Sequence, residues 1–145
     1  MPSRAKVILL VEDNPDDAAL ALRAFGKAGV PGEVVVLRDG IEALDYLLGT
    51  DPSPTTQAPC VVLLDLNLPR VDGLEVLRRL RADPRTRELP VVVMSSSEQE
   101  EDVACSYRMG ANAYIRKPVD YAEFVETARS FGAFWLVLNL VPGPF

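Results

Sequence analysis

Short runs of branched apolar residues alternate along the chain with longer stretches in which apolar residues recur at helical spacing. The short runs are residues 7–11, 33–37, 60–64, 90–94 and 113–115. Three of them are almost continuously apolar, which is typical of strands buried on both faces of a sheet. The alternation therefore predicts a parallel sheet covered by helices.

A side chain with an oxygen acceptor follows each predicted strand, with an acidic residue three positions later. The pairs are Asn14 with Asp17, Asp39 with Glu42, Asp72 with Glu75, Ser97 with Glu100, and Asp120 with Glu123. Such a side chain accepts hydrogen bonds from the free N–H groups of a first helical turn, so each pair predicts a helix start. The fifth helix is expected to run to about Trp135, and residues 49–59, which hold three prolines, are expected to form a surface loop.

Five strands and five helices in strict alternation indicate a doubly wound α/β fold. Because crossover connections are right-handed, few strand orders remain, and 2-1-3-4-5 is the expected order for a sheet of this size. Ligands of such folds bind outside the carboxyl ends of the strands, beside the point where the strand order reverses. That edge is where the chemistry of this chain is expected.

Composition narrows the possible functions. The chain of 145 residues fits one domain, and its net charge of −6 disfavours non-specific binding to nucleic acid or to anionic membranes. It contains no histidine, which excludes Ser-His-Asp and Cys-His catalysis and histidine-ligated zinc. No apolar run is long enough to span a membrane. With no secretory leader, Cys60 and Cys105 are expected to be reduced core residues of a cytoplasmic protein.

Polar side chains stand at the carboxyl ends of four predicted strands. Glu12 and Asp13 follow the first strand, Asp65 follows the third, Ser95 the fourth, and Lys117 follows the fifth. Since strands one and three are expected to be neighbours, the three carboxylates should converge and repel one another unless a cation is present. An all-oxygen ligand set favours Mg²⁺ over zinc or copper, so a magnesium site is predicted here.

These residues, together with Leu68-Pro69, Asp72-Gly73 and Pro118, resemble the receiver domains of two-component response regulators over essentially the whole chain. The resemblance implies the flavodoxin-like receiver fold. It implies that Asp65 accepts a phosphoryl group from a phosphohistidine on a partner sensor kinase, with Lys117 binding the phosphate. It further implies that Glu12, Asp13, Asp65 and the Asn67 carbonyl hold Mg²⁺. Ser95 and Tyr114 would occupy the two switch positions.

Other functions fit these residues less well. A phosphatase of the haloacid dehalogenase type needs an acid two positions after its nucleophile, where this chain has Asn67, an amide that cannot act as a general acid. The glycine-rich loops that bind nucleotides are absent after the first strand. A pseudo-receiver, which acts as a protein-interaction module without phosphorylation, remains the alternative function.

The segment from Phe131 to the C-terminus is unusually apolar for a chain end. We expect a receiver domain at residues 1–136, an apolar extension at 137–145 and no effector domain. Phe134, Trp135, Leu136 and Leu138 are expected to cover either the same molecule or a second copy, in a homodimer that also uses the fourth helix, fifth strand and fifth helix.

Two further features bear on the partners of the chain. The apolar ending and the loop before the third strand resemble the small regulators that serve bacterial phytochrome kinases. An arginine cluster (Arg78, Arg79, Arg81, Arg85, Arg87) is either a solvated helix face or a docking site for an acidic partner.

Overall fold

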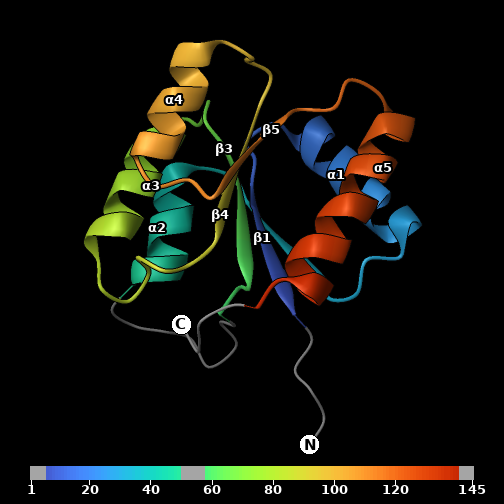
Figure 1. Ribbon diagram of the computed structural model, residues 1–145, viewed down its shortest axis with the longest axis horizontal. Coiled ribbons are helices and arrows are strands. Elements are labelled where there is room, and N and C mark those ends of the chain that lie inside the picture. Colours follow the sequence, from blue (N-terminus) through green and yellow to red (C-terminus); the bar gives the residue numbers. More distant parts are fainter. Residues whose placement is uncertain (1–5, 50–57, 141–145) are drawn as a thin grey trace, which may run out of the picture.

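The computed structural model describes residues 6–49 and 58–140 and consists of one sheet with helices on both faces (Figure 1). The five parallel strands lie in the order β2-β1-β3-β4-β5. The strands are β1 (Val7–Val11), β2 (Glu33–Leu37), β3 (Val61–Asp65), β4 (Val91–Ser95) and β5 (Ala113–Arg116). The helices are α1 (Pro15–Ala28), α2 (Gly40–Leu48), α3 (Gly73–Ala82), α4 (Glu100–Arg108) and α5 (Tyr121–Gly132), and a π-helical segment, η1 (Ala133–Leu138), follows α5. The predicted fold class and strand order are confirmed.

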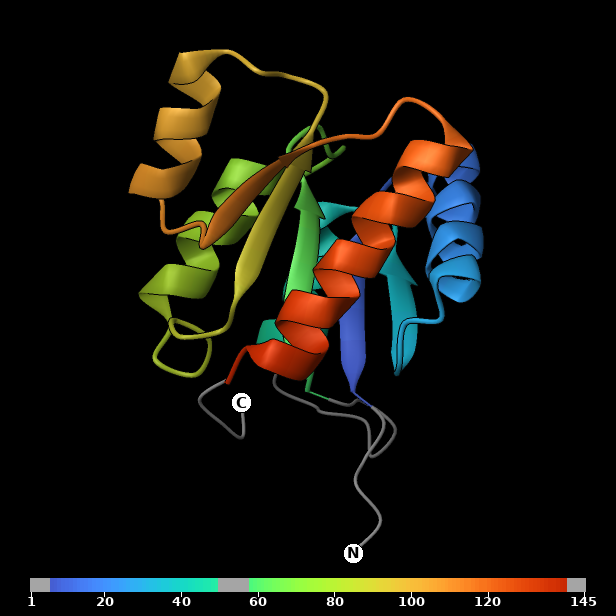
Figure 2. The ribbon, with the colours of Figure 1, turned by 45° about the vertical axis from the view of Figure 1, so that its right-hand side comes forward.

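Two apolar layers hold the sheet between the helices. Helices α1 and α5 cover one face, and α2, α3 and α4 lie on the other (Figures 1 and 2). Successive residues of a strand point to opposite faces, so Ile8 and Leu10 pack toward α1 and α5, whereas Leu9 and Val11 pack toward α2 and α3. Every residue of β1, β3 and β4 is buried, as their continuous apolar runs predict.

The first two strands have their predicted bounds, whereas the last three differ by one residue. β3 begins at Val61 and includes Asp65, β4 begins at Val91 and includes Ser95, and β5 extends to Arg116. The polar residues belong to the strands because the ladder continues through them: Asp65 pairs with Met94, and Ser95 pairs with Arg116. Asp65 and Ser95 are therefore held by regular sheet rather than by a loop.

Four of the five predicted helix starts are confirmed. The side chain of Asn14 accepts hydrogen bonds at the start of α1, and Asp39, Asp72 and Asp120 do the same at α2, α3 and α5. The predicted start at Ser97 is wrong. Helix α4 begins later, at Glu100, after Gln99, whose side chain makes no capping bond. The Ser97 hydroxyl instead accepts from the Gln99 N–H and donates to Asp102 within the first turn of α4.

The C-terminal helix ends differently from the sequence expectation. α5 ends at Gly132, not at about Trp135, and the chain continues as η1 to Leu138. A side chain at position 132 would meet the Val30 side chain at 2.8 Å, so glycine lets α5 approach the turn after α1. Residues 141–145 of the expected extension, and residues 50–57 of the expected loop, lie outside the described residues. Within the described parts of the chain, no helix is long and apolar enough to span a bilayer.

Candidate functional site

Three carboxylates meet at the carboxyl edge of the sheet, as predicted. Glu12 and Asp13 follow β1, and Asp65 is the last residue of the neighbouring strand β3. One carboxylate oxygen from each lies within 4.8 Å of those of the other two. Glu12 and Asp65 are buried, at 2% and 5% exposure, while Asp13 is exposed. The cluster therefore has two members fixed by the sheet and one that faces solvent.

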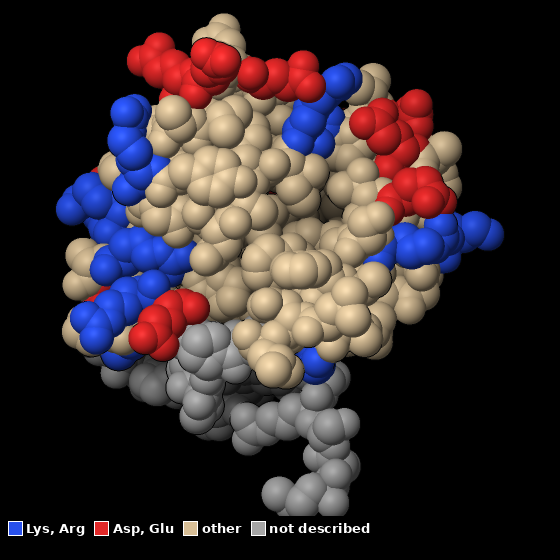
Figure 3. Space-filling view, viewed as in Figure 1, with Lys and Arg blue, Asp and Glu red and all other residues tan. Residues whose placement is uncertain are grey.

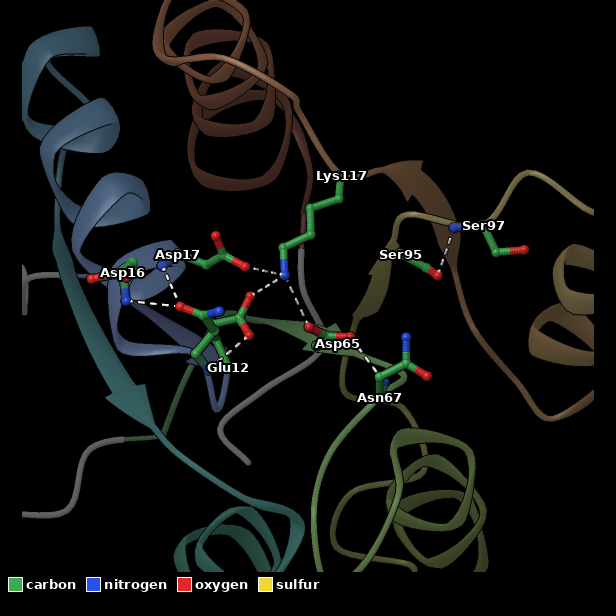
Figure 4. A network of polar contacts seen from close by, with 9 residues as sticks. Glu12, Asp16, Asp17, Asp65, Asn67, Ser95, Ser97 and Lys117 are labelled. Atoms are coloured by element: carbon green, nitrogen blue, oxygen red, sulfur yellow. Dashed lines mark hydrogen bonds and ion pairs between the residues drawn. The ribbon is translucent and has the colours of Figure 1, made fainter.

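Lys117 lies between these acids (Figure 4). Its Nζ atom lies 2.6 Å from Glu12 Oε1 and 3.2 Å from Asp65 Oδ2. A third contact, 2.8 Å to Asp17 Oδ2, was not predicted, because the sequence pattern indicated Asp17 only as part of the helix start. The acidic run from residue 12 to residue 17 was the available signal, since Asn14 turns the chain so that Asp17 points back to the sheet edge.

The charges of this site depend on one another. Burial, together with the nearby Asp65 charge, raises the pKa of Glu12 to about 7, although Lys117 opposes the shift. Burial alone would lower the pKa of Lys117, but hydrogen bonds to Asp17 and Glu12 and the charge of Asp65 outweigh it and raise the pKa. Lys117 thus stays protonated and is the resident cation of the cluster.

Asn67 contacts Asp65 through its backbone rather than through its side chain. The Asn67 N–H donates to Asp65 Oδ1 at 2.9 Å and so fixes the orientation of the carboxylate (Figure 4). The side chain of Asn67 is exposed and, in Figure 4, points away from Asp65. The expected role of its carbonyl as a metal ligand stays a prediction.

The two switch candidates are joined through Ser97. Ser95 is 2% exposed, and its Oγ accepts a hydrogen bond from the Ser97 N–H at 3.1 Å. The Tyr114 hydroxyl donates to the Ser97 carbonyl oxygen at 2.8 Å, and its ring is half-buried against the α2 and α3 layer. The structure thus links Ser95 at the site to Tyr114 on the edge strand through one residue.

The acids fit a hard cation. Oxygen ligands within 4.8 Å of one another match the ligand preference of Mg²⁺ and of other divalent ions that bind through oxygen. Sulfur and imidazole ligands are missing from the cluster, which argues against a zinc site. Glu12, Asp13 and Asp65 are therefore the residues that could hold a divalent metal ion.

The four residues predicted to form an interface do not share one environment. Leu136 is only 1% exposed and packs in the core under α1 and α5, so of the two expected roles it covers its own molecule rather than a second copy. Its position in η1 turns it inward, while Phe134 and Leu138 are 48% and 70% exposed. Trp135 is half-buried and contacts both Phe131 and Phe134.

Comparison with known proteins agrees with the geometry. A family model, the response regulator receiver domain, matches residues 8–129. The probable methanogenesis regulatory protein FilR2 of Methanothrix harundinacea is 41% identical over 95% of this chain and 88% of its own length.

Two solved structures resemble almost the whole chain. The phosphorylated cyanobacterial phytochrome response regulator RcpA has 40% identity and a TM-score of 0.87, covering 96% of this chain and 99% of its own. The Mn²⁺-bound form of response regulator Rcp1, from Synechocystis, has 35% identity and a TM-score of 0.84, covering 95% and 99%.

Proposed function

The chain belongs to the response regulator receiver domain family, and we propose that Asp65 is the residue on which it accepts the phosphoryl group. The supporting observation is the position of this carboxylate. Asp65 is buried at the end of a central strand, 3.2 Å from Lys117 and beside two further acids. One carboxylate with an adjacent cation and a metal-binding cluster is what phosphoryl acceptance by an aspartate requires.

We propose that Glu12, Asp13 and Asp65, with the Asn67 carbonyl, hold Mg²⁺. When bound, this ion neutralises charge on the phosphoryl oxygens. The all-oxygen ligand set supports Mg²⁺. The structure of the relative Rcp1 is of a Mn²⁺-bound form, which is an observation on that protein.

The chain's own residues then account for the transfer. An Asp65 carboxylate oxygen attacks the phosphorus of a phosphohistidine, the new P–O bond forms as the P–N bond breaks, and the imidazole of the kinase leaves. The Asn67 N–H orients the carboxylate for in-line attack. Lys117, already 3.2 Å from Asp65, pairs with the developing negative charge of the phosphoryl group.

The signal is a conformational change. The Ser95 hydroxyl would donate to the phosphoryl group and move the loop after β4, and Tyr114, bound to that loop through Ser97, would follow. The alternative, a pseudo-receiver that needs no phosphate, is not favoured, because Glu12, Asp13, Asp65, Ser95 and Lys117 are all present.

Intact mass spectrometry after incubation with acetyl phosphate and Mg²⁺ tests the acceptor. We expect the wild type to gain one phosphoryl group, and chelation of the metal to abolish the gain. Asp65→Asn should gain none, and Lys117→Ala should react much more slowly. Asp45→Asn, an acid of α2 outside the cluster, is the matched control and should react like the wild type. Labelling of Asp65→Asn would contradict the assignment.

We propose further that the phosphoryl donor is a phytochrome-type histidine kinase. The similarity to RcpA supports this, whereas FilR2, of comparable identity, is described as a regulator of methanogenesis. Transfer from a phosphorylated phytochrome kinase should be faster than from an unrelated histidine kinase. Equal transfer rates from the two kinases would contradict the proposal.

We also propose a homodimer through α4, β5, α5 and the C-terminal segment, with residues 1–136 as the receiver domain and 137–145 as the extension. Exposed apolar side chains of η1 and of the residue pair after it support the surface: Phe134, Val137, Leu138 and Leu140. Phe134 and Leu140 also line a groove of about 910 Å³, together with Ile115, Phe131 and Trp135. Trp135 and Phe134 thus remain interface candidates, whereas Leu136 does not.

A further inference from the structure

Lys117 lies among three carboxylates, and one of them stands apart from the other two. Its Nζ atom lies 2.6 Å from an oxygen of Glu12 and 3.2 Å from one of Asp65, both members of the acidic cluster that could hold a divalent ion. The third carboxylate, that of Asp17, lies 2.8 Å from Nζ and is not part of this cluster. Within the described residues, Asp17 is therefore the partner of Lys117 that a bound metal ion would leave free.

A divalent ion in the cluster would change the surroundings of Lys117. Oxygens that coordinate the ion are less able to neutralise the lysine, and the ion itself repels the ammonium group. The Glu12 and Asp65 side chains are only 2% and 7% exposed, so little water is at hand to replace what they no longer supply. Lys117 then depends on a carboxylate outside the ligand set.

Asp17 is placed to be that carboxylate. It belongs to the first turn of α1, where its N–H donates to Asn14 Oδ1 at 3.1 Å. Figure 4 shows Lys117 Nζ between Asp17 on one side and Asp65 on the other. A lysine that moves toward Asp17 therefore leaves the ligand oxygens without leaving the site. The Asp17 side chain is 39% exposed, so it stays charged without a large desolvation cost.

We propose that Asp17 is a positioning residue, which holds Lys117 beside the site when a divalent ion occupies the acidic cluster. With Asp17 present, the lysine is neutralised from outside the ligand set and does not compete with the ion for Glu12 and Asp65. Without Asp17, the lysine keeps these two acids as its counter-ions, and the ion binds more weakly. The inference rests on the proposed metal cluster.

The dissociation constant of Mn²⁺ tests this role without any phosphorylation. Mn²⁺ binds through oxygen as Mg²⁺ does, and electron paramagnetic resonance measures the unbound ion. We expect Asp17→Asn to raise the dissociation constant by about five- to tenfold, because a neighbouring negative charge is lost and Lys117 stays on the ligands. Asp16→Asn is the matched control. It removes the same charge from the same helical turn, but Asp16 is exposed and has no ion pair in the described chain, so the constant should change by less than about twofold.

Two further variants separate positioning from a general effect of charge or folding. In a Lys117→Ala background there is no ammonium group to hold, so Asp17→Asn should then have no larger effect than Asp16→Asn. Asp17→Glu keeps a carboxylate at this position and should bind Mn²⁺ more tightly than Asp17→Asn.

Three results would overturn the inference: Asp17→Asn binds Mn²⁺ as tightly as Asp16→Asn, its effect persists without Lys117, or Asp17→Glu binds no better than Asp17→Asn. Wild-type protein that binds no Mn²⁺ would overturn the proposed metal cluster, and this inference with it. Mn²⁺ binding without any labelling by acetyl phosphate would instead overturn Asp65 as the acceptor and leave the role of Asp17 intact.

Discussion

Gly73, the first residue of α3, packs directly against the backbone of the proposed phosphoryl acceptor. A Cβ atom at this position would lie 2.4 Å from the Asp65 carbonyl oxygen and 2.7 Å from Leu66 Cα, both of them backbone atoms that cannot rotate away. The Gly73 N–H also donates to the Leu66 carbonyl. The absence of a side chain at residue 73 therefore lets α3 begin close to the site and fixes the chain segment after Asp65.

Gly73→Ala should consequently damage both stability and function. Forcing α3 away from Asp65 should lower the free energy of unfolding by about 1–3 kcal/mol, as overpacking does. It should also slow phosphorylation by acetyl phosphate in the protein that remains folded. Urea denaturation and intact mass measure the two effects.

Gly26→Ala is the matched control, because a Cβ atom in that part of α1 would meet nothing within 4 Å. It should stabilise the protein by about 0.5–1 kcal/mol, since alanine favours helix over glycine. If Gly73→Ala proves as stable as the wild type, the close approach described above does not restrict residue 73.

At the scale of elements, α4 is the least embedded helix. Ser106 is its only buried residue, and polar contacts connect both of its ends to the rest of the molecule. Asp102 binds the loop at its start, and Arg81 donates to the Gly110 carbonyl just beyond its end. A helix held by a few polar contacts rather than by a large apolar face is suited to move when the loop at its start moves.

Arg81 is the member of the arginine cluster for which the structure gives a specific role. Its guanidinium donates to the carbonyls of Gly110, Thr86, Arg87 and Leu89 and to the Asn112 side chain. It thereby joins the end of α3 to the segments before β4 and β5. Arg78 and Arg79 instead pair with Glu75 on the exposed face of α3, and Arg85 pairs with Asp83.

Arg81→Ala should therefore cost about 2–3 kcal/mol of unfolding free energy, because it removes charged hydrogen bonds and leaves carbonyls without donors. Arg79→Ala removes the same charge from the same helix, but its one ion pair is exposed, so the urea midpoint should stay unchanged. Equal losses in the two variants would show that charge on α3, rather than the contacts of Arg81, is what matters.

The elements also show what a sequence can and cannot predict. Strands buried on both faces have unmistakable apolar runs, so the sheet and its order were predictable, and Asp65 and Lys117 could be placed by the strand each follows. The predicted helix start at Ser97 was wrong, because a capping pattern in the sequence does not show whether the side chain has another partner in the folded protein. The sequence left open whether Leu136 covers its own molecule or a second copy, because a π-helical segment changes which side chains face inward. The contact between Asp17 and Lys117 was not predictable, because it depends on the turn at Asn14, which only the three-dimensional structure shows.

At the scale of the whole molecule, charge is unevenly distributed. Figure 3 shows Lys and Arg gathered on the side where α3 lies and Asp and Glu above α4. Between them, over the middle of this view, lies a mostly uncharged surface that includes the region of β5. With Phe134 and Leu138 of η1 exposed below α5, this is the surface of the described chain that best suits the proposed homodimer.

Light scattering over a dilution series tests this homodimer. One series is run without beryllium fluoride and a second with it, because this compound mimics phosphorylation. We expect a dimer at high concentration in both series. Leu138→Asp places a charge in the apolar surface and should shift the protein to monomer, with the dissociation constant rising by at least about tenfold because burial of an unpaired charge is costly. Leu22→Asp, on an exposed leucine of α1, is the matched control and should dimerise like the wild type.

The surface is excluded as an interface if the wild type is monomeric at every concentration in both series, or if both aspartate variants dimerise equally well. An effect of Leu138→Asp alone would place the C-terminal segment within the interface, where a switch at Tyr114 on β5 could reach it.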